Sequence, residues 1–101
     1  MIGENLIGKR VIVRCNRAGV FYGTLAARDG QEVELHDVRR LWRWSGAASL
    51  SQLALEGVTN PYGCRFTMTV NNMVLLEAIE IIPCTNEAMA NIDRVPVWKI
   101  C

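Results

Sequence analysis

The first forty residues alternate between apolar and polar positions with the period of two that is typical of β-strands. One strand is predicted over residues 9–15 and a second over 20–27, where Gly23 marks a bulge or a close backbone approach. Asp29-Gly30 is a strong signal for a two-residue hairpin. A third strand over 31–37 follows, so this part of the chain is predicted to be a β-meander.

A fourth predicted strand, residues 38–44, leads into a helix. Ser49 begins a capping box, which favours a helix that starts just after it. The alternative is a helix that starts at Ala47 with Ser45 as its cap. An apolar stripe at helical spacing follows, and Gly57 is a typical C-terminal stop.

The second half of the chain predicts two more strands and a short helix. The strands span residues 65–70 and 73–82, and Asn71-Asn72 has the composition of the tight turn between them. Thr85 is the predicted cap of a helix that runs through Asn91. An extended tail follows and is anchored by Trp98.

These elements predict one α+β domain over residues 1–101. Its sheet is mostly antiparallel with about six strands in the order β-β-β-β-α-β-β-α, one central helix and one short C-terminal helix. Half of the residues are hydrophobic, which excludes a disordered or fibrous chain. A chain this small buries roughly two-thirds of its unfolded surface. Its three Trp residues therefore make a homo-oligomer interface plausible.

The charges nearly cancel, with 11 basic and 10 acidic side chains and a net charge of +1. Such a balance argues against a protein that coats long nucleic acids through its overall field. Nine of the basic residues are Arg and two are Lys. Because the Arg fork binds phosphate or carboxylate bidentately, this bias indicates either a local anion pocket or a set of surface ion pairs.

Several classes of protein are disfavoured by what the sequence lacks. The four Cys residues form no C-x-x-C pair, which argues against a zinc ribbon or finger, and no metal or other cofactor is expected. His36 is the only His and alternates with apolar residues, as on the polar face of a strand. Without a nucleophile–base pair, we expect no enzyme. No signal peptide or membrane span is evident, so we expect a cytoplasmic protein with reduced thiols and no membrane partner.

The densest functional cluster is Arg39–Trp44. On a strand, Arg40, Trp42 and Trp44 share one face. Indoles stack on a purine and Arg pairs with phosphate, so this face suits a nucleotide ligand. The alternative is that both Trp residues lie in the core or in an interface while Arg40 reaches solvent.

Four further positions carry weaker signals. Ser45 and Gly46 precede a helix whose free N–H groups would attract an anion, although an ordinary turn explains them too. Phe66 could close over a base or lie in the core, Asn72 could read a base edge or form a turn, and Arg94 could reach a neighbouring subunit. The predicted ligand-binding residues are Arg39, Arg40, Trp42, Trp44, Ser45, Gly46, Phe66, Asn72 and Arg94.

Four sequence blocks together resemble a family of short phage and prophage proteins: Gly8–Val13, Gly19–Gly23, Arg39–Val58 and Glu77–Thr85. This family is similar to the Thoeris anti-defence sponges, phage proteins that sequester cyclic ADP-ribose isomers made by bacterial immune enzymes. The resemblance implies a non-enzymatic cyclic-nucleotide binder in the cytoplasm of an infected bacterium. It also implies assembly as dimers that can build hexamers (trimers of dimers), and for some members a separate Arg-lined site for cyclic oligonucleotides.

Two other functions remain open. The first is an Sm-like or SH3-like RNA-binding or adaptor module, because the spacing of strand and turn residues resembles that of such small barrels: Val11-x-Val13, Gly19-Val20, Gly23-x-Leu25, Asp29-Gly30 and Val33-x-Leu35. A helix in mid-chain departs from those barrels, which usually carry their helix at the N-terminus. The second is a structural protein that uses the Trp face only for protein contacts.

Overall fold

The computed structural model describes residues 2–101 and contains six strands and two α-helices. The strands are β1 (Arg10–Cys15), β2 (Gly19–Asp29), β3 (Glu32–Arg43), β4 (Arg65–Phe66), β5 (Val70–Leu75) and β6 (Ala78–Pro83). The helices are α1 (Leu50–Glu56) and α2 (Asn86–Asp93), and single 3₁₀ turns span Glu4–Leu6 and Pro61–Gly63. The α+β class and the six antiparallel strands are confirmed. The order is β-β-β-α-β-β-β-α, with three strands before the central helix instead of four.

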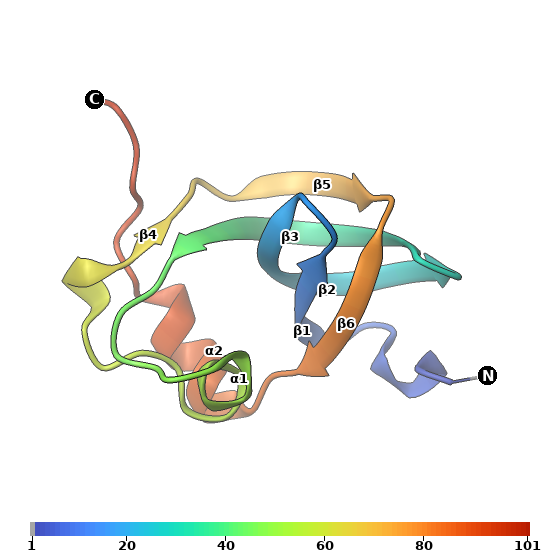
Figure 1. Cartoon of the computed structure of the whole chain (residues 1–101), viewed down its shortest axis with the longest axis horizontal. Coiled ribbons are helices and arrows are strands. Elements are labelled where there is room, and N and C mark those ends of the chain that lie inside the picture. The colour runs from blue at the N-terminus through green and yellow to red at the C-terminus, as the bar shows by residue number, and fades with distance from the viewer. Residues whose placement is uncertain (1) are drawn as a thin grey trace.

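The strands form one curled sheet around the long β3. The meander β1-β2-β3 is its centre, β6 pairs with β1, and both β5 and β4 pair with β3. Strand β5 pairs with the first half of β3, and β4 pairs with its second half. Figure 1 shows β5 and β6 at the two free edges of the curl, with both helices gathered at one end of it.

The curl depends on a bend where β2 and β3 approach closely. A Cβ added to Gly23 would lie 3.0 Å from the Cβ of Val38, so a larger residue here would force β3 to shift. The pairing shifts register between Tyr22 and Thr24, and Asp37 has the positive φ of 50° that accommodates the extra residue in β3. The close approach predicted at Gly23 is confirmed. The prediction of separate strands over 31–37 and 38–44 is wrong, because they are one strand bent at this bulge.

The predicted turn at Asn71-Asn72 is also wrong. Both residues lie inside β5, where Asn72 pairs with His36 and its amide donates to the Glu34 carboxylate at 2.6 Å. The chain turns instead at Leu76 and Glu77. Asn is common in turns, but the pairing with β3 overrides that local preference.

The helix signals are confirmed. Ser49 Oγ accepts from the Gln52 N–H at 3.2 Å, and Thr85 Oγ1 accepts from the Ala88 N–H at 3.1 Å. Helix α1 therefore begins after Ser49 and not at Ala47, and it ends at Gly57 with a φ of 83°. None of the helices in residues 2–101 is long and apolar enough to cross a membrane.

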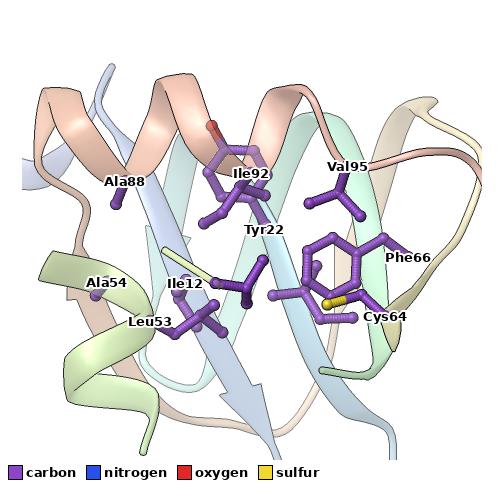
Figure 2. Packing of buried hydrophobic residues seen from close by; sticks show 11 residues of the cluster. Ile12, Tyr22, Leu53, Ala54, Cys64, Phe66, Ala88, Ile92 and Val95 are labelled. Carbon is purple, nitrogen blue, oxygen red and sulfur yellow. The ribbon is translucent and has the colours of Figure 1, made fainter. Parts of the chain in front are cut away.

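Two apolar cores share the sheet. One fills the space between the helices and the sheet and includes Tyr22, Phe66 and Ile92 (Figure 2). The other lies inside the curl and includes Val13 and Phe21. Successive residues of β1 and β2 point alternately into one core and the other, so these central strands are buried on both faces.

Burial of Tyr22 predicts a loss of stability at high pH. Its ring is fully buried and its hydroxyl donates to Asp93 Oδ1 at 2.9 Å. Burial raises its pKa to about 12. The unfolded chain releases this proton near pH 10 and the folded chain near pH 12, so the raised pKa stabilises the fold below pH 10 and that stability is lost between these values. The slope approaches about 1.4 kcal/mol per pH unit.

Urea denaturation from pH 8 to about 11.5 measures this slope. We expect Tyr22→Phe to remove its contribution, whereas Tyr62→Phe, at an exposed position, should leave the slope unchanged. An equal slope in the Tyr22→Phe and unmodified chains would rule out this origin.

Candidate functional site

Two exposed indoles from distant parts of the chain stack on the surface. Trp42 of β3 and Trp98 of the C-terminal tail have ring centroids 5.3 Å apart and ring planes inclined by 19°. Their exposed fractions are 56% and 44%, which is high for such large apolar rings. The sequence prediction paired Trp42 with Trp44 instead, but Trp44 is half-buried against the helices. The sequence indicated Trp98 only as the anchor of the extended C-terminal tail.

Arg65 of β4 completes this arrangement. Its guanidinium carbon lies 5.1 Å from the centroid of Trp42 and 5.3 Å from that of Trp98, so the three planar groups form a triangle with nearly equal sides. Both contacts lie within the range of cation–π attraction. We call Trp42, Arg65 and Trp98 the aromatic platform.

A β-bulge creates the platform. Leu41 pairs with Phe66 and Arg43 pairs with Arg65, so the register shifts at Trp42, and both Trp42 and Arg43 oppose Arg65. The bulge interrupts the strict alternation that the sequence predicted for Arg39–Trp44. It also makes Arg43 and Arg65 direct partners in the ladder, where two like charges are destabilising.

The arginines around the platform have no protein acceptor, unlike most others. Within residues 2–101, ion pairs or backbone carbonyls engage the guanidinium groups of Arg10, Arg14, Arg17, Arg28 and Arg39. The side chains of four others donate no hydrogen bond to any described residue: Arg40, Arg43, Arg65 and Arg94. Surface ion pairs therefore explain part of the Arg bias, and three of the four uncommitted groups lie at or beside the platform.

Arg40 borders three surface hollows next to the platform. Its guanidinium carbon lies 4.8 Å from the ring centroid of Phe21, and the N–H groups of its edge remain free. The hollow of about 320 Å³ is shared with Trp42 and Trp44, and that of about 330 Å³ with Trp98 and Lys99. A third, of about 360 Å³, continues between β5 and the β1–β2 turn. Arg40 is thus common to the hollows beside the platform and to the hollow between β5 and the β1–β2 turn.

The sequence model of a family described as a domain of unknown function, DUF6948, matches residues 8–92. The chain belongs to the DUF6948 family. No curated protein matches its sequence.

Two solved structures resemble the DUF6948 chain in fold. A heptameric archaeal Sm protein shares 18% identity over 81% of this chain and 94% of its own, with a TM-score of 0.52. The SmAP1 heptamer of P. aerophilum shares 17% identity over 82% of this chain and 88% of its own, also with a TM-score of 0.52. The small-barrel prediction is therefore confirmed at the level of fold. The central helix that departs from such barrels lies between β3 and β4. The resemblance to the Thoeris anti-defence sponges stays a prediction.

Arg39 is not a ligand-binding residue of the DUF6948 chain. It is only 5% exposed, because the inward face of β3 carries it beneath the C-terminal tail. Its guanidinium group donates to four backbone carbonyls at 2.9–3.4 Å, those of Thr67, Ile92, Phe66 and Pro96. Desolvation of this buried group lowers the pKa of Arg39.

The hydrogen bond from Arg39 to the Pro96 carbonyl holds the tail so that Trp98 stacks on Trp42. Val97 bridges Phe66, and the Trp98 N–H donates to the Phe66 carbonyl at 2.9 Å. Figure 1 shows the tail running beside β4 as a result. Arg39 therefore acts on the site as a positioning residue for Trp98.

The remaining predicted site residues lie elsewhere in the DUF6948 chain. Phe66 is fully buried, so it cannot touch a ligand. Asn72 binds Glu34, and Arg94 follows α2 without a described contact to the platform. Ser45 accepts from the Asn60 amide, and the Gly46 carbonyl accepts from Thr59. The start of α1 is already capped by its own Ser49 and Gln52 side chains.

Proposed function

We propose that the DUF6948 chain is an Sm-like module that binds single-stranded RNA at the aromatic platform. The observation that carries this proposal is the exposed triangle of Trp42, Arg65 and Trp98, flanked by Arg40 and Arg43. Unpaired bases stack on indole and guanidinium planes, and free guanidinium edges bind phosphate. The fold shared with Sm proteins supports this assignment.

The charge distribution favours a short contact. The net charge of +1 provides little long-range attraction for a polyanion. At the platform, however, Arg40, Arg43 and Arg65 are concentrated without an acidic ion-pair partner among residues 2–101. We therefore propose that the platform grips a few nucleotides and does not coat a long nucleic acid.

We further propose that copies of the chain assemble through the two free edges of the sheet. Val70 and Val74 are exposed on β5, Leu76 is exposed in the turn after it, and Ile79 is exposed at the start of β6. Pairing of β5 with β6 of a second copy would satisfy both open edges and cover these side chains. Such a head-to-tail contact forms a ring when the rotation between copies closes, and both Sm structures of similar fold are heptamers.

A second candidate function is sequestration of a cyclic nucleotide, as in a phage anti-defence sponge. The hollow of about 320 Å³ favours it, because two cations and two indoles line this small space: Arg17, Arg40, Trp42 and Trp44. A compact ring that carries phosphates would need no long-range field.

Titration of the tryptophan fluorescence with a single-stranded RNA of about ten nucleotides tests the main proposal. We expect quenching, and affinity that falls with salt with a logarithmic slope of about −2 if three phosphates are contacted. Duplex RNA of the same length should bind more weakly, because its bases are already stacked. Binding of cyclic ADP-ribose isomers or cyclic dinucleotides below about 10 μM, without RNA binding, would favour the second candidate, and no binding to any probe would reject both.

Sedimentation velocity tests the proposed assembly. We expect a homo-oligomer at micromolar concentration, and monomers for Val74→Asp and for Ile79→Asp, because each places a charge at one edge contact. Leu55→Asp on α1 is the matched control, since Leu55 is 56% exposed and Val74 is 58% exposed. A monomeric unmodified chain, or three variants that all stay oligomeric, would contradict the edge pairing.

A further inference from the structure

The two sides of the aromatic platform carry separate cationic groups. Along β3, Trp42 lies between Arg40 and Arg43. In an extended strand these two arginines are about 10 Å apart at their Cα atoms. At that separation, the two guanidinium groups can flank one nucleotide stacked on the platform.

On one side, Arg43 and Arg65 are opposed across the β3–β4 ladder. No carboxylate among the described residues pairs with either of them. The guanidinium carbon of Arg65 lies over both indole rings, and its N–H groups donate no hydrogen bond to any described residue. A phosphate bound between the two guanidinium groups would replace their repulsion with two charge-assisted contacts.

On the other side, Arg40 is set apart from that pair. It lies over the ring of Phe21, which fixes the plane of its guanidinium group. It borders one hollow with Trp42 and another with Trp98, so it faces the platform from beside both indoles. A second phosphate can bind there at the same time as the phosphate between Arg43 and Arg65.

We infer that the platform takes an internal nucleotide, with one phosphate at Arg43 and Arg65 and the other at Arg40. This inference rests on the proposed function and specifies the ligand of the same site. A nucleoside offers only the base, and a strand end offers only one phosphate. The arrangement therefore selects a nucleotide that has phosphates on both its 3′ and 5′ sides.

Fluorescence quenching by three adenosine compounds tests the inference at constant ionic strength. We expect adenosine 3′,5′-bisphosphate to bind at least about tenfold more tightly than adenosine 5′-monophosphate, and adenosine to bind most weakly. In Arg40→Gln and in Arg43→Gln, the bisphosphate should bind no more tightly than the monophosphate binds the unmodified chain. Arg94→Gln is the matched control, because the Arg94 side chain has no contact with the platform among the described residues, and it should leave all three affinities unchanged.

The outcomes separate the inference from the proposed function. Equal affinities for bisphosphate and monophosphate, with RNA binding intact, overturn the two-phosphate inference alone. Retention of the tenfold gain in Arg40→Gln overturns the role of Arg40. Loss of binding to RNA and to every nucleotide rejects the proposed function itself. Thermal melting of each variant distinguishes a lost contact from a lost fold, and since the side chains of these arginines donate no hydrogen bond within residues 2–101, all three variants should fold.

Discussion

Replacement of Arg39 by leucine is expected to lower the free energy of unfolding by about 3–5 kcal/mol. The side chain is buried between the sheet and the tail, and its guanidinium group satisfies four carbonyl oxygens. Leucine has no hydrogen-bond donor in its side chain. The buried carbonyl groups of Ile92 and Phe66 therefore lose the donor that Arg39 supplies. For a domain of this size the loss corresponds to a fall in Tm of about 12 °C or more.

Urea denaturation measures this effect. Arg43→Leu is the matched control, because Arg43 is an exposed arginine of the same strand, and it should change stability by about 0.5 kcal/mol or less. Arg39→Lys should fall between the two, since one ammonium group cannot reach four separated carbonyls. Equal stability of Arg39→Leu and Arg43→Leu would show that the buried hydrogen bonds contribute nothing.

Loss of either indole of the platform is expected to weaken single-stranded RNA binding strongly. Stacking of a base on an aromatic side chain contributes about 1–3 kcal/mol, so Trp42→Ala and Trp98→Ala should each reduce affinity roughly 5- to 150-fold. Because each indole also stacks on the other, the double variant should lose less than the sum of the two single losses. Both rings are about half exposed, so the fold should tolerate their removal far better than the loss of Arg39.

Fluorescence anisotropy of a labelled RNA reads out this loss. Tyr62→Ala is the aromatic control, because Tyr62 is 89% exposed and no described contact joins it to the platform. If Trp42→Ala bound RNA as tightly as Tyr62→Ala, the platform would not be the binding surface.

The link between these two predictions is the C-terminal tail. Arg39 donates to the Pro96 carbonyl, two residues before Trp98. Arg39→Leu is therefore expected to release the tail and to weaken RNA binding as well, although Arg39 itself touches no ligand.

The sequence alone determined the features that depend on residues close together in the chain. The strands β1 and β2 and the hairpin at Gly30 depend on neighbouring residues, and all are found where the pattern predicted them. The Ser49 and Thr85 caps depend on hydrogen bonds within three residues of the chain, and both are formed. The overall class, an α+β domain with a small curled sheet, follows from these elements.

The residues of the candidate site were predicted only in part. The predicted residues Arg40 and Trp42 line one hollow beside the platform, and their role in ligand binding stays a prediction. Arg39 and Phe66 belong to the interior, and Trp98 was not expected beside Trp42.

Only the tertiary structure decided which face of β3 is buried. It also decided which side chains contact Trp42, near the C-terminal end of this strand. The bulge at Asp37 joined two predicted strands into one, and the bulge at Trp42 changed which side chains lie opposite Arg65. Each extra residue reverses the face on which later side chains lie, and no local pattern reports it. The platform itself joins residues 42, 65 and 98, which come together only because the tail packs beside β4 above the buried Arg39.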